Sequence, residues 1–498
     1  MTRREFAKLL AGASLLSLVD ERILAGLDQN RDRLSWRAFQ NPSAEGTWKL
    51  TKIEGKIPRD LQGTLYRVAP GQKEKYGVKL RHLFDGDAYV AGYQIRDGKV
   101  ELKTRFVETP QRMAEVKAGK MLYNEFGTQA PLDPTGPPRG GANQPSVNII
   151  AWDGRLLGLS EGGHPSAIDP NDFGFQGYWD FHGTLPKNVP FTAHPKFDPK
   201  TGEGYGFGVK TGMKSALMVY HMLKDGTLKL LFEYPLTSYF MIHDMMISDN
   251  FIVFVIPPVT VDLKTMFSGK VSLAECLRFL ETTPTKIVVM RRDGTGTPVT
   301  IEQPSNMVFH HGNAFERDGK LVIDSILSAN GDILKRLASL DQDIVSGKSS
   351  ERLTRLVLDP VKGSVETRTE LTELVEFPRF NIHQTGKDAR YLYCAQTESN
   401  QDEAPFTRLM KFDLHRSKET VAKTKASQVY GEPVFVPHPT GKAEDDGWVL
   451  IQGYDGPQNQ TFLEIRQAQT LDLAARVWTG QHFPLGFHGN FEFGMFRK

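Results

Sequence analysis

The chain has 498 residues, of which 39% are hydrophobic and 24% are charged, a composition typical of a folded globular protein and not of extended disorder. Its 61 Lys and Arg residues nearly balance its 59 Asp and Glu residues, and the net charge of +2 excludes a protein built on the electrostatics of nucleic-acid binding. Two cysteines, Cys276 and Cys394, exclude a disulfide framework, and no apolar run approaches the ~20 residues of a membrane-spanning helix.

The first 30 residues differ in character from the rest of the chain. Arg3 and Arg4 precede an apolar segment at residues 9–19 that is too short to span a bilayer. This pattern resembles a twin-arginine export signal. We therefore expect a periplasmic or otherwise exported protein. The alternative is an amphipathic N-terminal helix on a cytoplasmic, membrane-associated protein.

From residue 57 onward the sequence indicates short strands separated by turns. Asp-Gly pairs, which favour tight hairpins, adjoin β-prone runs at several places. The clearest of these pairs are at residues 97–98, 293–294, 318–319 and 446–447. Amphipathic helical patterns are few, and the best of them are at residues 271–280 and 327–340.

Many antiparallel strands without helical crossovers favour an all-β fold, either a propeller, a barrel or a pair of sandwiches. No repeat period selects among these three architectures. No low-complexity linker divides the chain after residue 50, so we expect a single domain at residues 31–498.

Four of the 13 histidines lie beside apolar or aromatic residues: His194, His243, His310 and His488. A buried neutral imidazole needs partners for its nitrogens, so each is either a hydrogen-bonded core residue or a ligand. The four are far apart in the chain, which suits a site to which distant strands each contribute one residue. The residues alone leave both interpretations open.

Several blocks, in order along the chain, are similar to the motifs of the carotenoid cleavage oxygenases. They are residues 57–67 (IPRDLQGTLYR), 82–87 (HLFDGD), 118–120 (AGK), 309–316 (FHHGNAFE), 431–437 (GEPVFVP) and 444–448 (EDDGW). The resemblance covers about residues 50 to 498 and implies a seven-bladed β-propeller, with a few helices capping the face that holds the active site. It also includes lignostilbene dioxygenases as a related subgroup.

The resemblance implies one Fe(II) per chain, held by His194, His243, His310 and His488. It further implies that three glutamates, Glu161, Glu376 and Glu432, orient three of those rings. Neutral imidazole suits Fe(II), and a carboxylate behind a ligating ring fixes its tautomer. The scheme needs no separate acid–base residue, so no catalytic residue is assigned beyond the iron centre.

The substrate is indicated by two positions near the family's pocket. Val147 stands where many members have a threonine whose methyl group shields an open iron position. Phe106 stands where stilbene-cleaving members have a tyrosine that binds the substrate's phenol. Since a site built to bind a hydroxyl rejects substrates lacking it, losing that tyrosine favours a carotenoid or apocarotenoid over a stilbenoid.

The expected activity is therefore oxidative cleavage of a conjugated C=C bond by O2 to two carbonyl products. A stilbenoid substrate, isomerisation without cleavage and a non-catalytic propeller that only binds a ligand are the alternatives. The expected partners are an apolar polyene and O2, with peripheral membrane contact and no nucleic acid. Candidate apolar segments for the tunnel and the membrane contact are residues 251–258, 266–267 and 273–280, for which a core strand and a packed surface helix are the equal alternative.

Overall fold

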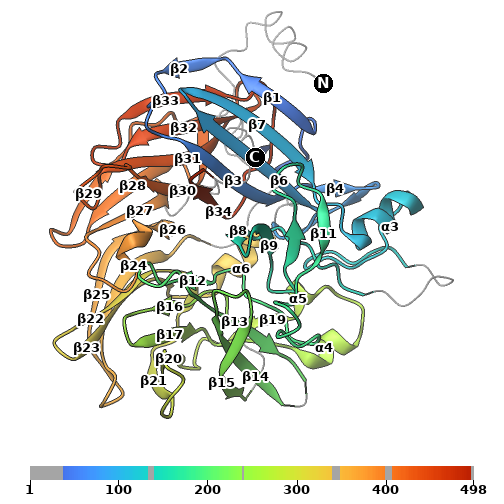
Figure 1. Ribbon diagram of the computed structural model, residues 1–498. Helices are drawn as coiled ribbons and strands as arrows, with labels where there is room; N and C mark the ends of the chain where they lie inside the picture. The colour runs from blue at the N-terminus through green and yellow to red at the C-terminus, as the bar shows by residue number, and fades with distance from the viewer. Residues whose placement is uncertain are drawn as a thin grey trace, which may run out of the picture.

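The computed structural model describes residues 37–132, 140–212, 214–237, 241–338, 348–398 and 406–494. Within these ranges, seven sheets of four or five strands follow one another around a ring (Figure 1). The fold is a seven-bladed β-propeller, mostly strand with few helices, which confirms the predicted fold class. The export signal or helix predicted at residues 1–30 lies outside the described residues.

Apart from β34, the first three blades take up the blue and green parts of the chain in Figure 1. The first blade contains β1 (Gly46–Leu50), β7 (Lys99–Phe106), β6 (Ala88–Arg96), β3 (Gly63–Pro70) and β34 (Gly489–Glu492). The second contains β11 (Phe175–Tyr178), β10 (Ser166–Ile168), β9 (Arg155–Leu159) and β8 (Asn148–Trp152). The third contains β12 (Lys196–Phe197), β13 (Gly204–Lys210), β14 (Ser215–Met222) and β15 (Leu228–Leu236).

The remaining four blades complete the ring. The fourth contains β16 (Met246–Ile247), β17 (Phe251–Ile256), β20 (Thr285–Arg291) and β21 (Val299–Gln303). The fifth contains β22 (Met307–Arg317), β23 (Lys320–Ser328), β24 (Glu351–Asp359) and β25 (Ser364–Glu373). The sixth contains β26 (Val375–Arg379), β27 (Tyr391–Gln396), β28 (Arg408–Asp413) and β29 (Lys418–Val421). The seventh contains β30 (Gln428–Pro437), β31 (Gly447–Asp455), β32 (Gln460–Gln467), β33 (Leu473–Trp478) and β2 (Ile53–Gly55).

Both ends of the chain close the ring. Strand β34 pairs antiparallel with β3, placing Gly489 opposite Arg67. Strand β2 pairs antiparallel with β33, placing Ile53 opposite Val477. Because each end supplies a strand to a blade built by the other end, the first and seventh blades are joined twice.

Two of the four clearest Asp-Gly pairs form tight hairpins, whereas residues 293–294 lie in the longer connection between β20 and β21, and Gly447 begins β31. Asp97 and Gly98, between β6 and β7, have φ angles of 52° and 72°, and Asp318 and Gly319, between β22 and β23, have φ angles of 51° and 72°. Two consecutive residues in the left-handed region are the signature of a tight hairpin that matches the twist of its strands.

The helices differ from those the sequence predicts. Residues 271–280 form only one helical turn, α5 (Leu273–Cys276), followed by β19 (Leu277–Phe279), which pairs with β18 (Val259–Val261). Short-range periodicity cannot separate a single turn from a full helix, and strand pairing takes the remaining residues. Residues 327–328 end β23, and the helix there is limited to α6 (Asp332–Leu337), with residues 339–340 outside the described ranges.

Several further short elements lie outside the blades. Helix α3 (Pro110–Ala118) starts with Thr109 accepting the amide of Arg112 and ends at the left-handed Gly119. Helix α4 (Leu263–Phe267) precedes α5 along the chain, and β4 (Glu74–Lys75) pairs with β5 (Val78–Lys79). The one-turn 3-10 helices are Arg37–Phe39 and Ile382–Gln384. Among the described residues no helix is long and apolar enough to cross a bilayer.

The apolar segment at residues 251–258 proves to be core. Strand β17 occupies most of it and pairs with β16 and β20 in the interior of the fourth blade. Ile252, Val253 and Phe254 are fully buried, which agrees with the core-strand alternative. A strand covered on both faces has the same continuous apolar sequence as an exposed apolar patch, so the sequence alone does not separate the two.

Candidate metal centre

Four different blades supply the four predicted histidines. His194 lies just before β12, His243 just before β16 and His488 just before β34, whereas His310 lies within β22. Each of these strands is an end strand of its sheet, and β16, β22 and β34 pack against the corresponding strands of neighbouring blades. The propeller therefore brings residues that are distant in the chain to one point on its axis.

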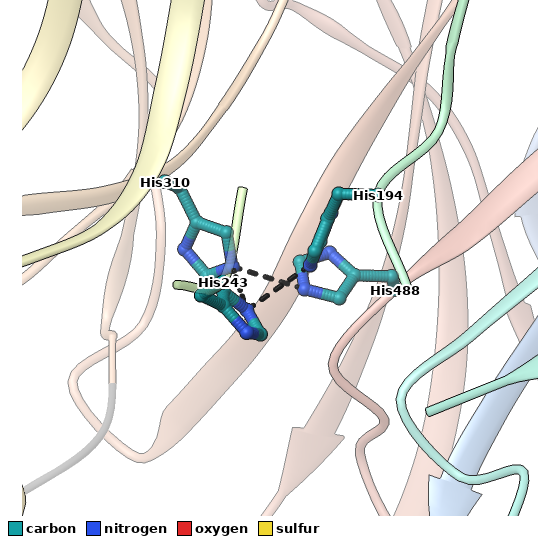
Figure 2. A group of neighbouring side chains, drawn as sticks. All are labelled: His194, His243, His310 and His488. Carbon is teal, nitrogen blue, oxygen red and sulfur yellow. Dashed lines mark hydrogen bonds between the residues drawn. The ribbon is translucent and has the colours of Figure 1, made fainter. Parts of the chain in front are cut away.

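The four imidazoles converge through their Nε2 atoms (Figure 2). The Nε2 atom of His243 lies 3.0 Å from that of His194 and 3.2 Å from that of His310, and the Nε2 atoms of His310 and His488 are 3.1 Å apart. Two ligands at right angles on a metal with bonds of about 2.1 Å lie about 3.0 Å apart. The spacing therefore fits four nitrogens around one ion.

Carboxylates lie behind three of the four rings. Glu432 Oε1 accepts from Nδ1 of His488 at 2.9 Å, and Glu376 Oε2 accepts from Nδ1 of His310 at 2.5 Å. Glu161 Oε1 lies 3.1 Å from Nδ1 of His243. A carboxylate accepts but does not donate, so Nδ1 carries the proton and Nε2 is left with a lone pair facing the centre.

At the His488–Glu432 pair the electrostatics favour a neutral ring facing an ionised carboxylate. Burial lowers the pKa of His488 to about 4, against the opposing effect of Glu432. Burial alone would raise the pKa of Glu432, but Arg379, His488 and Arg67 hold it well below its usual value. At His310, burial is outweighed by Glu376, which raises the pKa of that ring.

His194 is neutral because burial and its neighbouring rings act on its pKa in the same direction. Burial lowers its pKa well below the usual value, and the three neighbouring imidazoles add to the effect. Four lone pairs about 3 Å apart in a buried site repel one another unless a cation lies between them. The donor set of four imidazoles suits a borderline transition metal such as iron. The residues present therefore fit the metal that the resemblance implies.

Side chains that the sequence did not single out hold this arrangement in place. Arg67 and Arg379 both bind the carboxylate of Glu432, with N–O distances of 2.8 and 3.1 Å. Asn148 donates to the carbonyl of Ala193, the residue before His194, at 2.7 Å. Arg67 ends the motif segment at residues 57–67 and Asn148 follows Val147, but no local pattern gives them these roles.

Close backbone approach fixes the segment that carries His488. A Cβ atom on Gly486 would lie 2.0 Å from the carbonyl oxygen of Val68, and one on Gly489 would lie 2.1 Å from that of Tyr66. Only glycine fits such contacts without moving the backbone. Both ends of the His488 segment are thereby packed directly against β3.

A largely apolar cavity opens beside the histidines. It contains about 1110 Å³ of empty space, its opening to solvent included, and His243, His310 and His488 form part of its wall. Apolar side chains that line it include Phe84, Val147, Phe309, Phe377 and Leu485. This volume suits an elongated organic ligand held beside the metal.

The structure places one of the two predicted pocket residues in this wall and the other outside it. Val147 lines the cavity. Phe106 is not among the lining residues; instead its ring packs 4.9 Å from that of Tyr89 and 4.1 Å from the guanidinium of Arg112. Phe106 therefore does not line this cavity, and its strand β7 is separated from β34 by β6 and β3.

These features define a class of protein: a β-propeller with a four-histidine metal site at its axis beside an apolar cavity. Comparison with known proteins narrows the class. Residues 39–492 match the family described as RPE65, retinal pigment epithelial membrane protein. The chain is 32% identical to apocarotenoid-15,15′-oxygenase of Synechocystis sp. over 91% of this chain and 95% of that protein.

Two further relatives span similar lengths. Resveratrol cleavage oxygenase 1 of Aspergillus fumigatus is 29% identical over 84% of this chain and 87% of that protein. The crystal structure of cobalt-substituted Synechocystis ACO superposes with a TM-score of 0.85 and 31% identity, covering 93% of this chain and 98% of the other. The chain therefore belongs to the RPE65/carotenoid cleavage oxygenase family.

Proposed function

We propose that this protein is an Fe(II)-dependent dioxygenase that cleaves a conjugated C=C bond of a carotenoid or apocarotenoid. One oxygen atom of O2 goes to each carbon of the broken bond, giving two carbonyl products with no further reductant. The observation that carries the proposal is the convergence of four buried Nε2 atoms on the wall of an apolar cavity.

The chain's own residues bind and orient in this scheme. His194, His243, His310 and His488 hold the metal, and Glu161, Glu376 and Glu432 orient three of the rings. Iron supplies the activation of O2 when it is bound. The phenylalanines of the cavity exclude water and hold the polyene beside the metal, and no side chain is required to move a proton.

The activities in the relatives' names support two classes of substrate. The similarity to an apocarotenoid oxygenase is higher than that to a resveratrol cleavage oxygenase. A long apolar cavity supports the polyene. A stilbenoid is the second candidate, supported by the similarity to the resveratrol enzyme.

The proposal is tested on protein purified without oxygen. We expect about one iron per chain, O2 uptake with an apocarotenal, and two carbonyl fragments by mass spectrometry. His310→Ala should lose iron and activity, whereas His415→Ala, at an exposed histidine, should keep both. Cleavage of only a hydroxystilbene would replace the substrate class, and an isomerised polyene without fragments would replace the reaction. A protein that binds no iron would be a ligand-binding propeller.

We also propose peripheral membrane contact and export by the twin-arginine route. Leu263, Leu273 and Leu280, around α4 and β19, are 54%, 38% and 37% exposed, which supports peripheral membrane contact there. Replacing all three with serine should reduce binding to lipid vesicles without changing iron content.

Export by the twin-arginine route should fail when Arg3 and Arg4 are changed to lysine, as measured by fractionation of cells.

A further inference from the structure

An ion pair lines the cavity beside the metal-binding residues. Arg336 of α6 binds the carboxylate Oε1 of Glu351, the first residue of β24, and also contacts the hydroxyl of Ser349. The two charged side chains are 16% and 7% exposed. Among the described residues of the cavity wall, the other acidic side chains, Glu161 and Glu376, face histidines.

The pair lies on the same side of the cavity as His310. The carbonyl of Glu351 accepts the amide of Leu374, two residues before Glu376, whose carboxylate binds His310. Helix α6 presents Ile333, Arg336 and Leu337 to the cavity, the spacing of one helical face. The charged pair is thus set in a wall that is apolar on both sides of it.

Placing an ion pair in such a wall has a high desolvation cost. Apolar side chains of similar volume commonly give equal or greater stability than a buried pair. Burial raises the pKa of Glu351, with Arg336 opposing it. Oε2 of Glu351 accepts the amide of Ser350 at 3.0 Å, and a carboxylate oxygen has room for a second hydrogen bond. Glu351, held in place by Arg336, therefore offers a hydrogen-bond acceptor in the cavity wall.

We propose that Glu351, held in place by Arg336, binds a hydroxyl group at one end of the conjugated substrate. This inference rests on the proposed function and specifies its substrate. A hydroxyl can donate to the carboxylate of Glu351, whereas a carbonyl can only accept. A hydrocarbon end removes water from the pair and replaces none of its hydrogen bonds. Both a ring hydroxyl of an apocarotenoid and the phenol of a stilbenoid have this chemistry.

The test measures binding without oxygen, so that no cleavage occurs. Quenching of tryptophan fluorescence is followed with two matched pairs: an apocarotenal with and without a ring hydroxyl, and a hydroxystilbene with and without its hydroxyl. We expect the hydroxylated member of one pair to bind about 10- to 100-fold more tightly. The pair that shows the preference identifies the source of the hydroxyl. Equal affinities within both pairs, or no binding of either, overturn the inference.

Variants separate recognition from a structural role. Glu351→Gln should reduce the preference for the hydroxyl, and the double replacement Arg336→Met with Glu351→Leu should abolish it while the protein still folds. The matched control is Asp324→Asn, which removes the same charge from the buried Asp324–Arg355 pair of the fifth blade. It should leave the preference unchanged. A preference that survives both cavity variants overturns the inference.

Failure of this inference is distinguishable from failure of the proposed function. Admission of O2 after the binding measurement reports cleavage. Selective binding of the hydroxylated ligand without carbonyl products would support the polar anchor and contradict the oxygenase. Cleavage of both members of a pair with equal kcat/KM would support the oxygenase and contradict the anchor.

Discussion

Asp244 joins three of the four histidine-bearing segments. It follows His243, its Oδ1 binds Nζ of Lys196 at 2.7 Å, and its Oδ2 accepts the amide of His311 at 3.0 Å. Lys196 lies two residues after His194, and His311 lies next to His310. One carboxylate, 3% exposed, therefore ties together segments of the third, fourth and fifth blades.

We predict that Asp244→Asn weakens metal binding by about 10- to 100-fold, because supports behind the ligands commonly have effects of this size. The change removes the charge that holds Lys196 while keeping the shape of the side chain. Iron retention against increasing chelator measures the effect, and the melting temperature of metal-free protein shows whether the fold survives. Asp324→Asn serves as the control, and equal iron retention in both variants would contradict the prediction.

At the scale of elements, strand β34 both closes the ring and carries the chain away from His488. Its last residue, Glu492, lies opposite Thr64 of β3. Burial raises the pKa of Glu492 from 4.5 to about 7. The folded state therefore holds a proton between these values that the unfolded state has released. For such a group, stability is lost as the pH rises from about 4.5 to about 7.

We predict that Glu492→Gln makes the protein's stability less dependent on pH. The variant should gain stability relative to wild type at pH 8, where wild type has a buried charge, and gain little at pH 5. Chemical denaturation at both values measures the difference. The same substitution at the exposed Glu370 of β25 should leave the pH profile unchanged. A wild-type profile retained in Glu492→Gln would argue against a buried charge at the closure.

The sequence predicts those elements whose formation depends on residues adjacent in the chain. The Asp-Gly hairpins at 97–98 and 318–319 need only two adjacent residues, and they form where predicted. Helix α3 also carries a readable signal that was missed, a Thr-Pro start and a glycine end. By contrast, residues 277–279 become a strand only because β18 lies beside them, and this pairing has no local signature.

At the scale of the whole molecule, the site is predictable only in part. The four histidines follow from motifs and apolar surroundings, and the structure brings them together. Arg336 and Glu351 are separated by a strand-to-strand connection, and Arg67 reaches Glu432 from the opposite end of the chain. Such pairs depend on how the blades close around the axis, and a single sequence without family motifs carries no record of that geometry.

The same closure would make a metal ion held by the four histidines a structural link between blades. Its four ligands come from the first, third, fourth and fifth blades, so an ion bound only in the folded state draws four separate sheets together. A ligand at 100 times its dissociation constant stabilises the folded state by about 2.7 kcal/mol. We predict that removing the iron with a chelator lowers the melting temperature and that adding Fe(II) without oxygen restores it. Calorimetry of His310→Ala should show no difference between the two conditions, because its site is incomplete. An unchanged melting temperature in wild type after complete iron removal would mean that strand pairing and the Asp244 bridge hold the axis without the ion.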